Sequence, residues 1–359
     1  MQWETKIFLI RHAESEGNIY RRAHGHYNGL VTARGYKQLE QLEARFKTEK
    51  VDAVYSSDLK RTMTTAAAVA APHNLQINES NRLREVKMGV WEDTSWGDIE
   101  YKDTEMNRNF SQDPAQWNIE GGEAYADVQK RMYDYIVKTA SLHTGECIAF
   151  VSHGFAIRSL MSYLKKVPSE RTREVPYCDN TAVSLLHYES DELTVEYYGD
   201  NSHLSSELST LARQNWWRKE SHKGATENLR FMPLNEVASE QLLRIFSAKA
   251  GERALADKQY AAYHTDEPVG ILGIDTKRYA NNNTGWISYM HIMPHHRNKT
   301  YGTQLLGLAV SDFRKLRREK VRIELPSGNL ATNFLLKHDF SIVDMSDTVC
   351  LMEKDICNW

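Results

Sequence analysis

Short apolar runs alternate with helical patterns through the first half of the chain, and this alternation limits the possible folds most strongly. The runs IFLI (7–10), VDAVYSS (51–57) and CIAFVS (147–152) have the length of buried strands. Helical patterns lie near residues 33–47, 59–71, 124–142 and 155–164. Buried strands that alternate with helices are typical of a largely parallel sheet with helices on both faces. We therefore predict a three-layer α/β/α domain.

The end of this half and the length of the chain indicate a second domain. Two apolar runs separated by Ser190, Asp191 and Glu192 predict a hairpin of edge strands, and a polar helical pattern begins at Ser205. A single hydrophobic core rarely grows beyond about 250–300 residues, whereas this chain has 359. The segment SHKGATEN has one apolar residue and reads as a linker. We predict domains at 1–218 and 228–359, joined by a linker at 219–227.

Composition excludes several classes of partner. The net charge of −3 at pH 7 gives no field that would attract nucleic acid or a membrane. No apolar run reaches the ~18 residues of a membrane-spanning helix, and the first residues do not resemble a signal peptide. Four cysteines lack the CxxC or CxxH spacing of a zinc site and form no disulfide framework pattern. We expect a cytoplasmic protein.

Polar side chains follow three of the apolar runs directly. Arg11 and His12 follow the first run, Arg61 lies in the first turn after the second, and His153 follows the third. Ligands of an open parallel sheet bind beyond the carboxyl ends of its strands, where these side chains converge. Arginine matches phosphate oxygens, and imidazole supplies a nucleophile and a proton-handling group. The pattern predicts phosphoryl transfer through a phosphohistidine.

A leaving alkoxide needs a proton, and a carboxyl group is the expected donor. Glu85 lies in the irregular segment LREVKMGVWED and is the first candidate. Spacing alone leaves four rivals open, which are Glu14, Asp58, Glu92 and Asp93. His24 and His26 lie in the loop after His12, where contact with substrate and chance placement are about equally expected.

Six segments in order resemble the histidine phosphatase superfamily, the phosphoglycerate mutase-like fold, over roughly the first 205 residues. They are RHAESEGN, LVTARGYKQ, YSSDLKRTMTTA, LREVKMGVWED, IEGGEAYADVQKR and VSHGFAIR. The resemblance implies that His12 is the nucleophile and Glu85 the proton donor. It also implies that Arg11, Asn18, Arg61 and His153 bind phosphate, with His153 also taking part in catalysis.

Two positions depart from this family's pattern. Ala13 replaces a glycine after the nucleophile, where a methyl group is small enough to be tolerated, and Phe155 replaces the second glycine of SHGG and is expected to narrow or line the pocket. The segment from Glu85 to His153 is compact, whereas mutases of the family carry a longer insertion there. The compact segment favours a phosphatase over a mutase. We expect no cofactor in this domain.

The second half resembles the Gcn5-related N-acetyltransferase (GNAT) family, an α+β fold, over about residues 226–357. RNKTYG lies at the position of the acetyl-CoA loop, before a helix expected from Thr303, and NLATNFLLKHDF resembles a later family helix. The resemblance implies acetyl-CoA as a possible cofactor and an amine as acceptor. The implied contacts are Ile292, Arg297, Asn298, Lys299, Thr300, Tyr301, Gly302, Thr303 and Asn329.

Departures in this half bear on chemistry more than on fold. Leu335 replaces a tyrosine that often protonates the departing thiolate, so another acid such as His338 would be needed. Thr300 replaces the middle glycine of the loop, where its side chain would crowd the pyrophosphate. His291, His295 and His296 have no carboxylate at ligand spacing in the sequence, and we predict no metal site.

The sequence therefore predicts a phosphomonoesterase acting through a phosphohistidine on a small phosphorylated metabolite, fused to an acetyltransferase-like domain. A phosphoglycerate-type mutase is the alternative within the same chemistry. An alternative of another class is a regulatory protein whose degenerate second domain senses acyl-CoA.

Overall fold

The computed structural model describes residues 4–214, 227–236 and 256–358. The chain forms two compact units: the first contains Met1–Ser15, Ala23–Glu92 and Asp103–Lys219, and the second contains Glu16–Arg22, Asp93–Lys102 and Glu220–Trp359. The linker expected at 219–227 lies outside the described residues except for residue 227. The segment SEQLLRIFSAK (239–249), whose sequence predicts a helix, also lies outside the described residues. None of the described helices is both long and apolar enough to cross a membrane.

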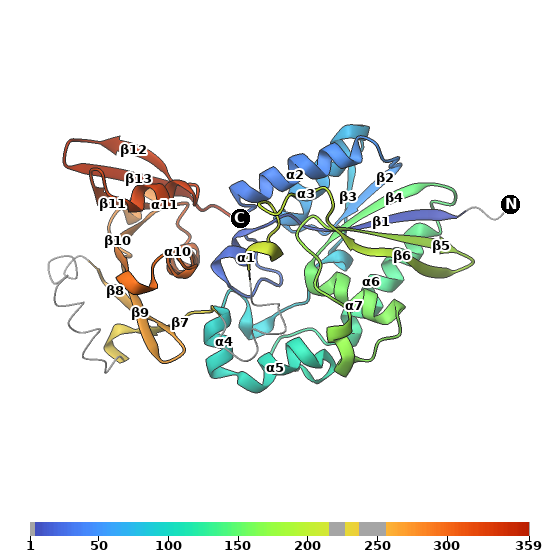
Figure 1. The fold of residues 1–359 in the computed structure, drawn as a ribbon, viewed down its shortest axis with the longest axis horizontal. Coiled ribbons are helices and arrows are strands. Elements are labelled where there is room, and N and C mark those ends of the chain that lie inside the picture. Colours follow the sequence, from blue (N-terminus) through green and yellow to red (C-terminus); the bar gives the residue numbers. More distant parts are fainter. Residues whose placement is uncertain (1–3, 215–226, 237–255, 359) are drawn as a thin grey trace. The chain divides into compact units, whose positions relative to one another are not determined.

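A six-stranded sheet forms the centre of the first unit (Figure 1). Its spatial order is β3-β2-β4-β1-β5-β6. The first four strands are parallel to one another, β5 is antiparallel to β1, and β6 is antiparallel to β5. The strands are β1 (Thr5–Arg11), β2 (Ala53–Ser56), β3 (Ile77–Glu79), β4 (Cys147–Ser152), β5 (Val183–Glu189) and β6 (Glu192–Asp200). The expectation of two edge strands in the final hairpin is wrong, because β5 pairs with β1 and, of the two hairpin strands, only β6 lies at an edge of the sheet.

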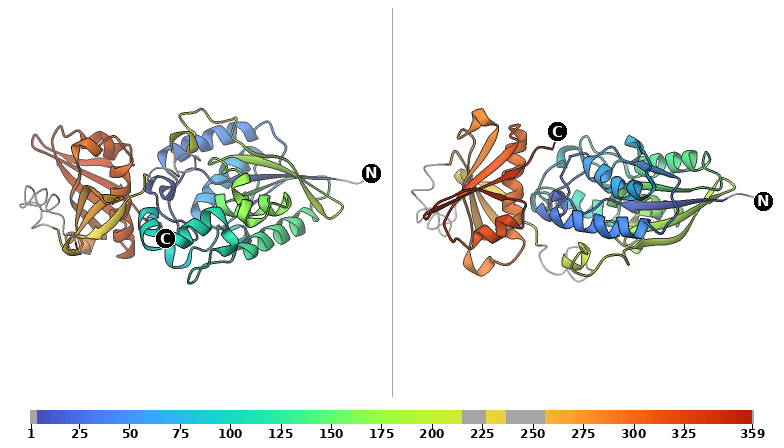
Figure 2. Two further views of the ribbon diagram at one scale, coloured as in Figure 1. Left: turned by 60° about the horizontal axis from the view of Figure 1, so that its bottom comes forward. Right: turned by 90° about the horizontal axis from the view of Figure 1, so that it is seen from above.

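Helices cover both faces of this sheet, so the predicted three-layer α/β/α fold is confirmed (Figure 1 and Figure 2). Helices α2 (Ala33–Phe46) and α3 (Lys60–Ala70) lie on one face, and α6 (Tyr125–Ala140) and α7 (Gly154–Leu164) on the other. The Thr32 hydroxyl accepts the Gly35 N–H and thereby caps α2, whose apolar side buries Leu42 and Phe46.

Shorter elements complete the first unit. Helix α5 (Thr104–Gln112) lies between β3 and α6 in the chain. The 3₁₀ turns are η1 (Ala71–His73), η2 (Asn81–Leu83), η3 (Gly89–Trp91), η4 (Pro114–Gln116), η5 (Ser169–Glu174) and η6 (Leu211–Arg213). The polar helix expected from Ser205 is wrong up to residue 214, where the described chain contains only η6, and its remainder lies outside the described residues.

The second unit contains a seven-stranded sheet in the order β12-β13-β11-β10-β9-β8-β7. All neighbouring strands are antiparallel except β10 and β11, which are parallel. The strands are β7 (Arg230–Pro233), β8 (Lys258–His264), β9 (Glu267–Asp275), β10 (Thr284–Ile292), β11 (Lys320–Pro326), β12 (Ser341–Met345) and β13 (Val349–Asp355). The helices are α1 (Glu16–Tyr20), α4 (Trp96–Lys102), α10 (Tyr301–Lys315) and α11 (Ala331–Leu336), with 3₁₀ turns η8 (Leu234–Glu236), η9 (Ala280–Asn282) and η10 (Pro294–His296).

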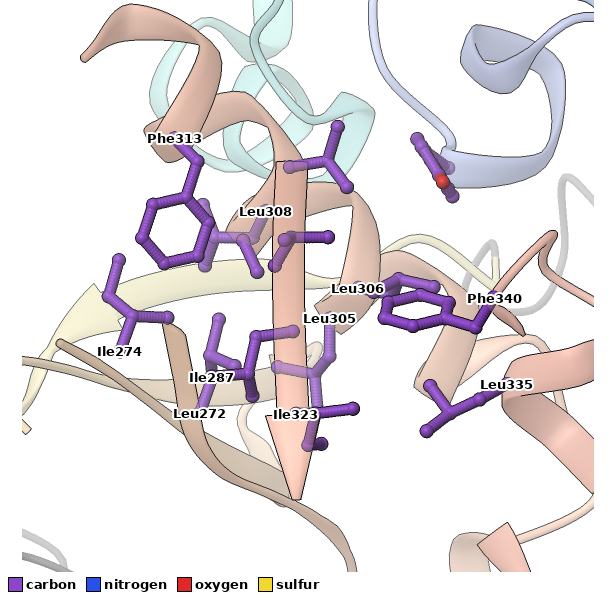
Figure 3. Packing of buried hydrophobic residues seen from close by; sticks show 14 of the residues in the cluster. Leu272, Ile274, Ile287, Leu305, Leu306, Leu308, Phe313, Ile323, Leu335 and Phe340 are labelled. Carbon is purple, nitrogen blue, oxygen red and sulfur yellow. The ribbon is translucent and has the colours of Figure 1, made fainter. Parts of the chain in front are cut away.

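Helix α10 supplies much of the core of this unit. Leu305, Leu306 and Leu308 pack with sheet residues such as Ile287 and Ile323 in one buried cluster, which Figure 3 shows from close by. The helix begins at Tyr301, slightly before the Thr303 expected from the sequence. The parallel pairing of β10 with β11 runs only from Thr284 opposite Lys320 to Ile287 opposite Ile323, although both strands continue further.

Candidate active site

Three neighbouring strand ends bring the predicted phosphate residues together. Strand β4 lies between β1 and β2, with Ser152 opposite Arg11 and Val151 opposite Ser56. Two backbone hydrogen bonds continue this pairing beyond the strands: His12 N–H donates to the Ser152 carbonyl at 3.0 Å, and Ser57 N–H donates to the Val151 carbonyl at 3.0 Å. The residues that follow the three strands therefore lie at one edge of the sheet.

His12 is buried and its proton is placed by a single contact. Its Nδ1 lies 2.7 Å from the Ala13 carbonyl oxygen. A carbonyl only accepts, so Nδ1 carries the proton and the lone pair is on Nε2. Burial, together with the charges of Arg61 and Arg11, holds the pKa of His12 well below its usual value of 6.5. At neutral pH the ring is therefore a neutral imidazole with an unprotonated Nε2.

His153 lies beside His12, with 5.3 Å between the two ring centroids. Its Nε2 is 2.9 Å from the Ser57 Oγ, and its buried Nδ1 has no hydrogen-bond partner among the described residues. Burial is the largest cause that lowers the pKa of His153 well below 6.5, followed by the charge of Arg61. Both rings are therefore neutral in a site that already contains positive charge, a state that suits the arrival of an anion.

The two arginines are held by backbone carbonyls. Arg61 is buried, and its guanidinium donates to the carbonyls of Tyr27 and Gly25 at 2.8 Å each. Burial lowers the pKa of Arg61 to about 10, so it stays charged at neutral pH. Arg11 donates to the Cys178 carbonyl at 2.6 Å. The Nε atoms of both arginines are buried without a hydrogen-bond partner in the described parts of the chain.

Gly154 allows Arg11 to lie close to the start of α7. A Cβ atom at position 154 would come within 3.1 Å of the Arg11 Nε and 3.3 Å of its Cζ. A larger residue would push the guanidinium away from the strand ends. The close approach of Arg11 therefore explains why a glycine suits the position after His153.

Glu85 contacts the first turn of α7, the helix that begins directly after His153. Its Oε1 accepts the N–H groups of Val86 at 2.9 Å and Ala156 at 2.8 Å, and its Oε2 accepts the N–H of Phe155 at 3.0 Å. A carboxyl group has about four lone-pair positions. Three are occupied by backbone donors, and the remaining position on Oε2 is where a transferable proton would be carried.

The four rival carboxylates are engaged elsewhere. Asp58 forms a two-point ion pair with Arg84. Glu14 accepts the hydroxyl of Thr32 and the guanidinium of Arg34.

Glu92 accepts backbone N–H groups of three residues around it, and Asp93 belongs to the second compact unit, where it pairs with Arg22. Among the five candidates, Glu85 contacts the segment that carries His153.

The loop after His12 supports this arrangement. The Nε2 of His26 lies 3.0 Å from the Glu85 carbonyl oxygen, to which it donates, so this histidine contacts the backbone of the predicted proton donor. Burial lowers the pKa of His26. The ring of His24 lies against Tyr27, with centroids 4.9 Å apart.

Three further polar residues hold the site and were not singled out as site residues from the sequence. Ser57 contacts His153 as described above. Thr65 accepts the Ala13 N–H at 2.9 Å through its hydroxyl, and the Asn180 amide donates to the His12 carbonyl at 2.9 Å. Ser57 and Thr65 lie within the YSSDLKRTMTTA segment, which is the signal that pointed to them. Asn180 lies in a loop that no motif marks.

Aromatic side chains surround Phe155. Its ring stacks on Phe110 with centroids 4.6 Å apart and planes 11° apart, and it meets Tyr125 edge to face at 6.0 Å. Trp91 and Trp117 are buried next to Phe110. Phe155 is thus one member of an aromatic cluster at the start of α7.

Asn18 is the one predicted phosphate residue outside the first compact unit. It lies in α1, which is grouped with the second unit, so its place at the phosphate remains a prediction.

The predicted acetyl-CoA residues lie around the start of α10 and the end of β10. Ile292 is the last residue of β10, and its carbonyl accepts Arg297 Nε at 3.1 Å. Asn298 has φ of +60°, which turns the chain toward Lys299 and the helix. Thr300, Tyr301, Gly302 and Thr303 form the helix start, and Asn329 accepts the Ala331 N–H before α11.

Three side chains that bear on the departures from the acetyltransferase pattern, Thr300, Leu335 and His338, have defined contacts in the structure. The Thr300 hydroxyl accepts the Gln304 side-chain amide at 3.2 Å, so it is held on the helix. Leu335 is fully buried in the hydrophobic core, and His338 Nε2 lies 3.0 Å from the Thr303 hydroxyl. The first N–H groups of a helix have no acceptor within the helix, which makes the start of α10 a suitable place for phosphate oxygens.

An α/β fold that gathers two neutral histidines and two arginines at the strand ends of its sheet defines an enzyme that acts on phosphate groups. The chain belongs to the histidine phosphatase superfamily (branch 1), which matches residues 7–201, and the acetyltransferase (GNAT) family matches residues 224–340. The predicted fusion of these two families is thereby confirmed.

Relatives of this chain include named phosphatases and mutases. It is 31% identical to phosphoserine phosphatase 1 of Hydrogenobacter thermophilus over 185 residues, 52% of this chain and 87% of that protein. It is 29% identical over 206 residues to a probable phosphoglycerate mutase, GpmB, of Salmonella choleraesuis, covering 56% and 95%. The solved structure of Bacillus stearothermophilus YhfR matches with a TM-score of 0.54 at 29% identity, over 56% of this chain and all of that one. The chain is therefore an enzyme of the histidine phosphatase type.

Proposed function

We propose that this enzyme hydrolyses a small phosphomonoester and that His12 Nε2 receives the phosphoryl group. The observation that carries the proposal is the contact between His12 Nδ1 and the Ala13 carbonyl, which places the lone pair on Nε2. The lowered pKa keeps that lone pair unprotonated at neutral pH. Attack on phosphorus forms the N–P bond as the bond to the substrate oxygen breaks.

Arg11, Arg61 and His153 bind the oxygens of the transferring group in this proposal, together with Asn18. A phosphoryl group in transfer carries its charge on three oxygens, and fixed cationic donors stabilise that charge. The Nε atoms of both arginines and the Nδ1 of His153 are buried and have no hydrogen-bond partner among the described residues, so a bound phosphate would satisfy them.

Glu85 gives its proton to the departing alkoxide and then takes one from water. The water oxygen attacks phosphorus, the N–P bond breaks, and inorganic phosphate leaves with His12 neutral again. The position of Glu85 at the start of α7 and the remaining lone-pair position on Oε2 support this assignment.

Leaving-group dependence tests the role of Glu85. Replacing Glu85 by Gln should reduce kcat/KM for an alkyl phosphate by about 10²- to 10⁴-fold, the usual contribution of a general acid. The reduction for p-nitrophenyl phosphate should be much smaller, because p-nitrophenolate leaves without a proton. Asp58→Asn is the matched control, and equal losses with both substrates in Glu85→Gln would refute the assignment.

A mutase remains the second candidate because one relative is a probable phosphoglycerate mutase. A mutase moves phosphate between two positions of one substrate and needs a bisphosphorylated intermediate. Phosphorus NMR of the products distinguishes the two: release of free phosphate alone supports the phosphatase, and a shifted phosphomonoester supports the mutase.

We further propose that the second domain binds acetyl-CoA at the start of α10, between Arg297 and Thr303. Since Leu335 is buried at the position where a thiolate acid is common, binding without catalysis is the expected behaviour. Calorimetric titration of the whole protein with acetyl-CoA tests this, with Gly302→Val as a variant whose side chain would meet the Phe334 ring. Binding with no acetyl transfer to any amine tested supports a sensing role, and absence of binding in the wild-type protein refutes the proposal.

A further inference from the structure

A carboxylate and two histidines meet at the end of β10, away from the phosphatase residues in the sequence. Glu267 is the first residue of β9, and His295 and His296 lie in η10, which follows β10. Their ligand atoms all lie within 4.8 Å of one another. Glu267 is far from both histidines in the sequence, so ligand spacing along the chain does not reveal this carboxylate.

The contacts within this group are those of a three-residue ligand set. Glu267 Oε1 lies 3.0 Å from His296 Nε2 and 3.8 Å from His295 Nε2. The two imidazole rings have centroids 4.1 Å apart. In tetrahedral zinc sites with Zn–N and Zn–O distances near 2.0–2.1 Å, neighbouring ligand atoms lie about 3.3 Å apart. The two separations from Glu267 Oε1 lie on either side of that value.

The backbone around the group is fixed by the sheet. Gly270 is paired with Ile292, the Met293 N–H donates to the Val269 carbonyl at 2.9 Å, and the His296 N–H donates to the Met293 carbonyl at 2.9 Å. These bonds set the distance between the start of β9 and η10. The ligand positions are therefore determined by strand pairing and not by a free loop.

Burial differs among the three residues in a way that suits capture of an ion. The side chain of His296 is 6% exposed, and its Nδ1 has no hydrogen-bond partner within the described residues. The side chains of His295 and Glu267 are 60% and 57% exposed. One ligand is thus held rigidly, while two solvent-facing ligands can rotate toward an ion that arrives from water.

We propose that Glu267, His295 and His296 bind one zinc ion, or a chemically similar divalent transition-metal ion, with water in the fourth position. Two imidazoles and one carboxylate form a ligand set typical of zinc. Magnesium and calcium prefer sites made of oxygen ligands and would bind poorly. The ion would join the start of β9 to the turn that leads into the Arg297–Thr303 segment, and so restrain the proposed acetyl-CoA loop.

Calorimetric titration of the metal-free full-length protein with zinc chloride tests the site. We expect one zinc ion per chain in this site and no comparable binding of magnesium. Glu267→Gln and His295→Ala should each weaken binding by more than about 10-fold, since even loss of a residue that only supports a ligand costs that much. Both side chains are exposed, so these variants should fold.

Two controls separate this site from adventitious binding. His291→Ala removes a histidine of β10, the strand that precedes η10, which is not in the group, and should leave zinc affinity unchanged. His12→Ala should also leave it unchanged, which excludes an ion held by the phosphatase histidines. Zinc should raise the Tm of the wild-type protein and not that of Glu267→Gln. Absence of zinc binding, or equal affinity in Glu267→Gln and the wild-type protein, would overturn the proposal.

Discussion

The hydrogen bond between Ser57 and His153 gives a measurable prediction about the phosphate pocket. The Ser57 hydroxyl lies 2.9 Å from His153 Nε2, and both side chains are buried. Replacing Ser57 by Ala removes this partner and leaves both nitrogens of the buried ring without one, since Nδ1 already has none among the described residues. His153 would then hold its orientation less well when phosphate binds.

The size of the effect follows from the net free energy of one hydrogen bond, about 0.5–1.5 kcal/mol. At ~1.4 kcal/mol for each factor of ten, kcat/KM of Ser57→Ala should fall by about 2- to 12-fold. The affinity for inorganic phosphate as an inhibitor should fall in parallel, because His153 contacts the bound anion in the proposed mechanism.

Ser56→Ala is the matched control. Ser56 is equally buried, and its hydroxyl donates to the Ser57 carbonyl at 2.8 Å instead of contacting a histidine. Both variants should lower Tm to a similar small extent, while only Ser57→Ala should lose activity and phosphate affinity. The reasoning is refuted if Ser56→Ala loses as much activity as Ser57→Ala, or if Ser57→Ala retains wild-type kcat/KM.

Three further predictions concern stability. The pKa values of His12 and His153 in the folded chain lie well below 6.5, so below about pH 6.5 the unfolded chain binds protons that the folded chain does not. Tm should therefore fall as pH is lowered from 7 to 5, and it should fall less steeply in His12→Asn. An equal dependence of Tm on pH in the variant and the wild-type protein would contradict this. Phe155→Leu removes the stack on Phe110 and should lower the free energy of unfolding by about 1 kcal/mol in urea titrations, whereas no change would show that the stack contributes nothing. Leu305→Ala empties a fully buried position of α10 and should lower the stability of the second unit by about 2–5 kcal/mol in urea titrations, and an unchanged unfolding transition would contradict this.

The sequence alone predicts that several residues of the candidate site lie together, because these residues lie at the ends of apolar strands. Arg11, His12 and His153 needed only the rule that ligands bind beyond strand ends. Glu85 can be distinguished from the other four carboxylates only when their partners in the fold are known. Asp58, for example, pairs with Arg84, and local spacing in the sequence does not reveal this pair. The same limit hid the contact of Asn180 with His12, which joins residues 168 positions apart.

Strand order and clusters of residues from different strands cannot be predicted from local sequence patterns either. The hairpin of β5 and β6 was recognised, but the inner position of β5 is decided by its pairing with β1, which the local pattern does not encode. The pairing of β9 with β10 brings Glu267 next to His296. This proximity cannot be seen from the positions of the two residues in the sequence.

In the proposed mechanism, His12 becomes phosphorylated during turnover. Rapid quenching after mixing the enzyme with a ³²P-labelled phosphomonoester would capture this intermediate. The proposed mechanism predicts a labelled protein whose phosphate is released by acid and retained in base, and no labelled protein in His12→Asn. Wild-type turnover without any labelled intermediate, or labelling that persists in His12→Asn, would contradict the claim.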